Sequence, residues 1–238
     1  HLRVIELAVE CAAGRIQVVA GTGANSTAEA IHMTQEAEKM GVDGTLQVCP
    51  YYNKPSQEGV YAHFKAIADA TRLPIMLYSI PGRCGIEISV ETVGRLAKDC
   101  PHIICVKEAG GNVDRVSQLM QVVPEDFTIL CGDDGLTVPF MACGASGLVS
   151  VSSNLIPGIM NSIVKAGLDK NMAEMPGMIR PDLQALPQVR DRMTFLYLEL
   201  AQACGQMLDG TFPRTRGGDP CRRSVSTPAS FFSPHTRG

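Results

Sequence analysis

The stretch PIMLYSIPGRCGIEISVETVGRLAKDCPHIICVK, residues 74–107, decides the fold. An apolar run, Pro74–Tyr78, is followed by a helix-like segment, Ser89–Lys98, and then by a second apolar run, Ile103–Lys107. Short apolar runs that alternate with amphipathic helices are typical of βαβ units, whose parallel strands are buried on both faces. The stretch therefore predicts a strand, a crossover helix and a second strand parallel to the first.

The same alternation continues on both sides of this unit. Further strands are predicted at 16–20, 45–48, 128–131 and 147–151. Further helices are predicted at 2–13, 26–40, 56–71, 113–122, 137–143 and 155–167. Two α/β architectures fit this order, an open doubly wound sheet and a (β/α)8 TIM barrel. Because a complete barrel has eight strands, the pattern fits a barrel that lacks its first two strands, although periodicity alone leaves both architectures open.

Composition divides the chain into three parts. Residues 1–170 carry the alternating pattern, 171–210 support helices only, and 211–238 are rich in Pro, Gly and Arg. The last part repeats Pro-x-Thr-Arg-Gly at 213–217 and 234–238. Such a composition cannot bury enough apolar surface to offset its ordering entropy. We expect a partial barrel, a degenerate C-terminal helical region and a disordered basic tail; a polyanion-binding arm and a shifted reading frame are the alternatives.

Composition and charge also restrict the partners and the compartment. The net charge of −3 does not favour nucleic acid. No apolar run approaches the length of a membrane span, and the first residues do not form a secretory signal. Nine cysteines without a CxxC pair indicate thiols in a reducing compartment rather than a disulfide framework. The sequence thus predicts a cytoplasmic protein that does not bind membranes.

Lys107 is the most informative single residue. It ends the apolar run that begins at Ile103, so a barrel would place its side chain at the rim of a dry interior. Burial lowers the pKa of a lysine amine, and a neutral amine can attack a ketone to form a Schiff base. An ion pair with Glu108 or with another carboxylate is the alternative role for Lys107.

Two further side chains stand near the ends of predicted strands. Tyr78 ends the strand before that of Lys107, where a phenol can shuttle protons or simply pack in the core. Arg83 follows in a Pro-Gly-Arg turn and can clamp a carboxylate or remain solvated. The loop GTGAN at 21–25 lacks a full nucleotide-binding pattern. Adjacent carboxylates at 133–134 do not make a metal-ligand set, so no metal site is predicted.

Several segments together carry a resemblance to a known family. They are GTGANSTAEAI (21–31), PYYNKPSQEGVY (50–61), LYSIPGR (77–83), VKEAGGN (106–112) and GDD (132–134). In this order and spacing they resemble the dihydrodipicolinate synthases, pyruvate-dependent class I aldolases related to N-acetylneuraminate lyase. The YYNKP block and the arginine of PGR favour the synthases over the lyases. The resemblance runs from His1 to about Glu174 and implies a (β/α)8 barrel that forms a homodimer or homotetramer.

The resemblance also implies an activity and roles for particular residues. The activity is condensation of pyruvate with L-aspartate 4-semialdehyde in lysine (diaminopimelate) biosynthesis, through a Schiff base and without a cofactor. By motif, Lys107 would form the Schiff base, Tyr78 would relay protons, and Tyr52 would be lent to the site of a partner subunit. Arg83 would bind the aldehyde's carboxylate. Another pyruvate-dependent aldolase and an inactive fragment of the family remain the alternatives.

Other positions follow from the same motifs. Gly132 and the backbone carbonyl of Val149 would bind substrate. The positions that match a lysine-feedback site in regulated members are His1, Asn25, Glu29 and Tyr51. Family members begin with a segment ending in GTTGE, whose threonines bind the pyruvate carboxylate, and this segment is not in the printed sequence. We therefore expect the strands at 16–20 and 147–151 to face an open gap. We also expect that trapping pyruvate on Lys107 with borohydride labels this chain only weakly.

Overall fold

The structure, a computed structural model, describes residues 1–171. Its strands are β1 (Val19–Gly21), β2 (Gly44–Val48), β3 (Ile75–Ser79), β4 (Ile103–Glu108), β5 (Thr128–Cys131) and β6 (Gly147–Leu148). Its helices are α1 (Leu2–Ala12), α2 (Thr27–Lys39), α3 (Gln57–Asp69), α4 (Pro81–Cys84), α5 (Val90–Asp99), α6 (Asp114–Met120), α7 (Thr137–Ala142) and α8 (Pro157–Leu168). Two short 3-10 turns, η1 (Asp134–Leu136) and η2 (Ser152–Asn154), complete the elements.

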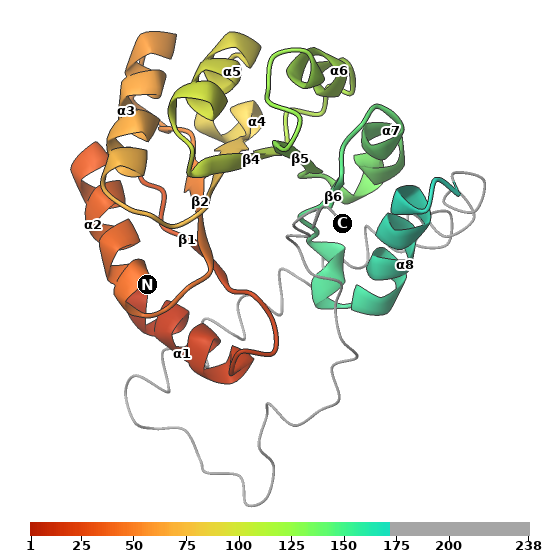
Figure 1. The fold of residues 1–238 in the computed structure, drawn as a ribbon, viewed down its shortest axis with the longest axis horizontal. Coiled ribbons are helices and arrows are strands. Elements are labelled where there is room, and N and C mark those ends of the chain that lie inside the picture. The colour runs from red at the N-terminus through yellow and green to blue at the C-terminus, as the bar shows by residue number, and fades with distance from the viewer. Residues whose placement is uncertain (172–238) are drawn as a thin grey trace, which may run out of the picture.

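The strands form one parallel sheet in the order in which they occur along the chain, β1 to β6. The sheet curls, and the helices cover its convex side (Figure 1). A doubly wound sheet would reverse its strand order and carry helices on both faces, so the observed arrangement is that of a β/α barrel. Within residues 1–171, β1 and β6 are the edge strands of this sheet, so the two strands expected to border a gap do lie at its edges.

Serine caps fix where three of the helices begin. The side chains of Ser26, Ser56 and Ser89 each accept a hydrogen bond from the backbone N–H three residues later, at the starts of α2, α3 and α5. Such a cap satisfies one of the amide donors that a helix leaves unpaired at its first turn. The cap at Ser26 agrees with the helix predicted to begin at residue 26.

The core has two layers because consecutive strand residues point to opposite faces. Between the sheet and the helices, strand residues such as Leu77 and Val106 pack in a cluster with Phe64 of α3. On the concave face, a smaller cluster contains the buried side chains of Met76 and Cys105 together with Leu130. This inner cluster is the apolar part of the barrel interior next to the carboxyl ends of β3 and β4.

Some predicted boundaries were wrong, and next to the first strand a side chain takes up a backbone donor. The first strand begins at Val19 rather than residue 16, and the N–H of Val18 donates to Asp43 Oδ2 at 2.7 Å. The last strand ends at Leu148 rather than residue 151. Residues 81–84, predicted as a turn, form the short helix α4, whose Pro81 fits the first helical position.

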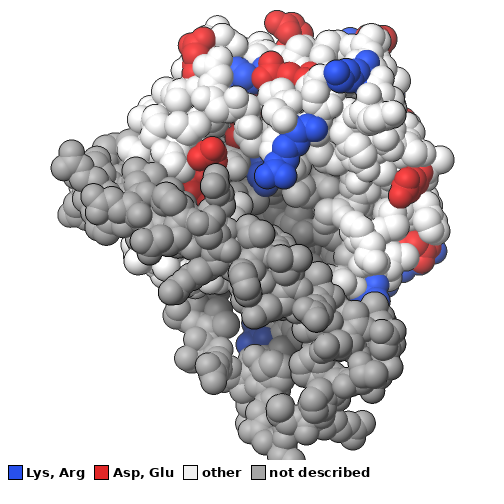
Figure 2. All heavy atoms as spheres, turned by 180° about the vertical axis from the view of Figure 1, so that it is seen from behind, with Lys and Arg blue, Asp and Glu red and all other residues white. Residues whose placement is uncertain are grey.

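The remaining predictions of organisation fall largely outside this structure. The predicted helical region 171–210, apart from Asn171, and the tail 211–238 lie outside the described residues. No helix within residues 1–171 is long and apolar enough to span a membrane. On the face seen in Figure 2, acidic and basic side chains are interspersed and no large area of the described surface carries one sign. This distribution gives no support to a nucleic-acid surface on that face.

Candidate active site

Lys107 and Tyr78 lie side by side at the carboxyl ends of adjacent strands. The ladder between β3 and β4 pairs Tyr78 directly with Lys107, so both side chains leave the same face of the sheet. The Nζ atom of Lys107 lies 4.1 Å from the centroid of the Tyr78 ring, a distance at which an amine or ammonium interacts with the aromatic face. The structure therefore brings together the predicted imine-forming and proton-relay residues.

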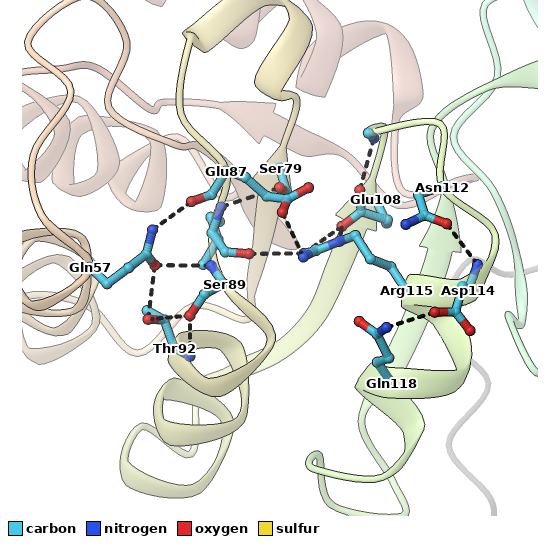
Figure 3. A network of polar contacts seen from close by, with 12 residues as sticks. Gln57, Ser79, Glu87, Ser89, Thr92, Glu108, Asn112, Asp114, Arg115 and Gln118 are labelled. Atoms are coloured by element: carbon cyan, nitrogen blue, oxygen red, sulfur yellow. Dashed lines mark hydrogen bonds and ion pairs between the residues drawn. The ribbon is translucent and has the colours of Figure 1, made fainter.

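Glu108 points away from this pair and does not neutralise Lys107. Its carboxylate is fully buried on the side of the sheet covered by helices, where it pairs with Arg115 of α6 at 3.0 Å. Its other oxygen accepts a hydrogen bond from the N–H of Gly110 at 2.8 Å. Figure 3 shows Arg115 between Glu108 and Glu87. The guanidinium of Arg115 also donates to Ile88 O at 2.8 Å. The alternative ion pair between Lys107 and Glu108 is thus wrong.

The surroundings of the lysine favour a neutral amine. Burial, the largest effect, lowers the pKa of Lys107; the charge of Asp134 opposes this, and the charge of Arg83 adds to it. Burial also raises the pKa of Tyr78, so the phenol keeps its proton at neutral pH. An amine whose pKa is lowered, beside a protonated phenol, is the pair needed for attack on a carbonyl with proton transfer.

Gly132 packs against the stem of this lysine. A Cβ built on Gly132 would lie 2.6 Å from Ala109 Cβ and 3.1 Å from Lys107 Cε. The backbone N–H of Gly132 donates to Glu108 O at 2.8 Å, which continues the ladder beyond β5. A side chain at this position would therefore clash with Ala109 and crowd the stem of Lys107. The structure thus places the predicted substrate-binding Gly132 at the lysine, while a contact with substrate stays a prediction.

A basic rim lies beside the pair. Arg83 of α4 is exposed and has no ion pair among the described residues, yet its charge acts on both Lys107 and Tyr78. Gly85 adopts φ +70°, and a Cβ there would lie 2.8 Å from Lys54 Cε. Lys54 was not predicted as a site residue, and the one sequence feature that could have indicated it is its place in the YYNK loop. Cations here favour substrates that carry carboxylates.

Val149 lies directly after β6, and its position depends on β5. Its N–H donates to Cys131 O at 2.8 Å, and its side chain packs against the inner cluster. The segment that follows is held by Asp134 Oδ2, which accepts from the N–H of Val151 at 3.1 Å and of Ser152 at 3.0 Å. Sequence reasoning considered Asp134 only as a poor metal ligand and missed this contact, for which the sequence carries no local signal.

Tyr52 is not brought to Lys107 within this chain. It lies in the loop after β2 with 89% of its surface exposed. Its φ of +72° is in the left-handed region, which is uncommon for a bulky residue and is often found at functional loops. The predicted role of Tyr52 in the site of a partner subunit therefore stays a prediction.

The four predicted feedback residues lie at or beside the loop after β1. His1 Nε2 lies 2.7 Å from Gly21 O, and Asn25 Nδ2 donates to Tyr51 O at 3.2 Å. Glu29 lies in the first turn of α2, where its N–H donates to the Ser26 cap. The structure places Asn25 and Tyr51 in contact, His1 near the same loop and Glu29 beside it, while lysine binding stays a prediction.

Fold and side chains together define a class: a β/α-barrel protein whose strand ends carry a half-buried lysine against a tyrosine ring. Within residues 1–171, no cluster of three or more His, Cys, Asp or Glu side chains could hold a metal ion. The model of the Dihydrodipicolinate synthetase family matches residues 1–207. The chain belongs to this family.

Individual relatives agree with this assignment. The 4-hydroxy-tetrahydrodipicolinate synthase of Persephonella marina is 51% identical over 174 residues, which are 73% of this chain and 59% of that protein. The crystal structure of dihydrodipicolinate synthase from Aquifex aeolicus superposes with a TM-score of 0.76 at 43% identity and covers 80% of this chain and 64% of that one. A relative from Cyanidioschyzon merolae, described with lysine bound, has a TM-score of 0.66 at 45% identity over 68% of this chain and 55% of that one. The chain therefore spans about three fifths of the curated relative's length.

Proposed function

We propose that Lys107 forms a Schiff base with pyruvate. The observation that carries this proposal is the half-buried amine of Lys107, 4.1 Å from the Tyr78 ring centroid at the carboxyl end of β4. Burial lowers the pKa of this amine, which raises the fraction that can attack a ketone. Family membership supports the choice of an aldolase over other barrel chemistries.

The steps balance without a cofactor. The lysine nitrogen attacks the ketone carbon of pyruvate, and loss of water from the carbinolamine gives an iminium ion. Loss of a proton from the methyl carbon gives an enamine, whose electrons form the new carbon–carbon bond to an aldehyde. Bond formation leaves an iminium ion on the lysine again. The amino group of L-aspartate 4-semialdehyde attacks the iminium carbon, closes the ring and expels the lysine amine. Tyr78, protonated because burial raises its pKa, donates and recovers protons during formation and loss of water.

We assign the second substrate to the basic rim. L-Aspartate 4-semialdehyde carries a carboxylate, and Arg83 is a guanidinium without an ion pair among the described residues, close enough to act on both site residues. A guanidinium can hold a carboxylate through two parallel hydrogen bonds. The backbone carbonyl of Val149 and the Gly132 turn would line the pyruvate side, and Tyr52 would reach the site of a second copy in a dimer or tetramer.

At the level of the whole protein, we propose 4-hydroxy-tetrahydrodipicolinate synthesis in lysine biosynthesis, carried out in the cytoplasm by a homodimer or homotetramer. Because the chain spans about three fifths of its curated relative, turnover is best tested in a chimera. Residues 1–171 replace the matching segment of the Aquifex aeolicus relative, which supplies the remainder of the barrel. The chimera is expected to consume pyruvate and L-aspartate 4-semialdehyde together.

Matched variants separate the roles in that chimera. Lys107→Arg keeps the charge but should abolish turnover, whereas Lys98→Arg should not change it. Tyr78→Phe should lower kcat by about 10²-fold or more, as expected for loss of a proton-transfer group. Arg83→Ala should raise KM for the aldehyde and leave KM for pyruvate unchanged. Turnover that survives Lys107→Arg would refute the proposal.

A further inference from the structure

Asp134 joins two segments that are far apart in the sequence. It opens η1, directly after β5, and its Oδ2 atom accepts three hydrogen bonds from the segment after β6. The donors are Val151 N–H at 3.1 Å, Ser152 N–H at 3.0 Å and Ser152 Oγ–H at 3.0 Å. One carboxylate oxygen thus holds the backbone that continues from Val149.

The second oxygen of Asp134 has no partner among the described residues. Oδ1 is buried and accepts no hydrogen bond. A buried polar oxygen without a donor is costly, and in native proteins such exceptions occur at functional sites. The cost is reduced if a cation or a donor lies nearby when the site is in use.

The neighbouring cation is Lys107. Gly132, two residues before Asp134, has its Cβ position 3.1 Å from Lys107 Cε, so the turn that carries Asp134 also packs against the lysine stem. The groups that act on the charge of Lys107 are Asp134 from η1, Arg83 from α4 and Cys131 from β5, with the Tyr78 ring in contact from β3. Among these groups in residues 1–171, Asp134 is the one carboxylate.

We propose that Asp134 is a positioning residue with two functions: it fixes the backbone after β6, and it supplies the negative charge that stabilises the cationic state at Lys107. The iminium proposed above keeps a positive charge on the lysine nitrogen, so the same carboxylate would stabilise it. This inference rests in part on the proposed function, but both of its functions can be measured without pyruvate.

The first measurement is the pH dependence of the acylation of Lys107. The full chain is treated with acetic anhydride at a series of pH values, and the modified Lys107 peptide is quantified by mass spectrometry. Because the carboxylate of Asp134 raises the pKa of Lys107, Asp134→Asn and Asp134→Ala should both shift the midpoint of acylation to lower pH. Ser152→Ala removes one hydrogen bond but keeps the charge, so its midpoint should stay at the wild-type value.

The second measurement is hydrogen exchange at the amides of Val151 and Ser152. Asp134→Ala should lose the protection of both amides, whereas Asp134→Asn retains an acceptor oxygen and should keep most of it. A purely structural role would predict that both variants leave the acylation midpoint of Lys107 unchanged. That result, or full protection of both amides in Asp134→Ala, would overturn the inference.

The outcomes also separate this inference from the proposed function. If pyruvate does not label Lys107 but the acylation midpoint shifts as described, the Schiff-base proposal fails and the role of Asp134 stands. If pyruvate labels Lys107 but the Asp134 variants show neither change, the reverse holds. Asp134→Asn preserves shape and one acceptor, so a folding failure of Asp134→Ala would still leave the midpoint test decisive.

Discussion

Replacement of Arg115 by methionine should destabilise the chain strongly. The Arg115 side chain is 6% exposed and that of Glu108 is 0% exposed, with the charged groups 3.0 Å apart. Methionine fills much of the space but leaves the Glu108 carboxylate buried with only the N–H of Gly110 as a donor. Loss of one partner from a buried ion pair costs about 3–5 kcal/mol.

The cost of this substitution should depend on pH. Burial raises the pKa of Glu108, and Arg115 opposes this shift, so its removal moves the pKa further upward. A carboxyl group whose folded pKa is above its unfolded value stabilises the protein at low pH and loses that contribution as pH rises through the folded value. Arg115→Met should therefore be better tolerated near pH 5 than near pH 8.

Urea unfolding followed by circular dichroism measures these effects. Arg95→Met is the matched control, because Arg95 and Glu58 form an exposed pair, with 48% and 69% of their side chains accessible; its loss should cost about 0–1 kcal/mol. The double variant Glu108→Gln, Arg115→Met removes the buried charge and should recover much of the stability lost by Arg115→Met. The reasoning is refuted if Arg115→Met costs no more than Arg95→Met.

Three further predictions concern other regions of the fold. Burial lowers the pKa of His63 to about 4, below its unfolded value, so the wild type should lose stability as pH falls from about 6.5 towards 4. Unfolding curves of His63→Gln should show a smaller loss of stability over this pH range. Those of the control, the exposed His32→Gln, should match the wild type. Gly132→Ala should crowd Lys107 Cε, cost about 1–3 kcal/mol in urea unfolding and slow pyruvate trapping, whereas Gly82→Ala, where nothing lies within 4 Å, should not affect trapping. If the loop after β1 binds free lysine, calorimetry on the chimera should detect binding that Asn25→Ala weakens; equal affinity in both proteins would contradict the feedback assignment.

The positions of the strands were predictable because they are local. Apolar runs such as Ile103–Lys107 are short, bounded by turn residues and separated by amphipathic helices. The cap at Ser26 was predictable for the same reason, since the signal and its amide partner lie three residues apart. Lys107 and Tyr78 could be predicted as neighbours because consecutive parallel strands end at the same edge of a sheet.

The missed features depend on contacts between distant residues. Asp134 accepts hydrogen bonds from residues 17 and 18 positions later. Arg115 contacts Glu108 and Ile88 from α6. The spacing of residues in the sequence therefore predicts neither the burial of Arg115 nor that Glu108 pairs with it instead of with Lys107. Lys54 lies against Gly85 from another loop. No local pattern specifies such contacts, because they arise only when the sheet has curled.

The most direct test of the central claim is the position of a trapped pyruvate adduct. The chimera is incubated with pyruvate, reduced with borohydride, digested and mapped by mass spectrometry, with Lys107→Arg and Tyr78→Phe treated alongside. We expect one reduced adduct on Lys107, no adduct in Lys107→Arg and slower formation in Tyr78→Phe. An adduct on Lys54 or Lys98 instead, or no adduct in a chimera that is folded, would contradict it.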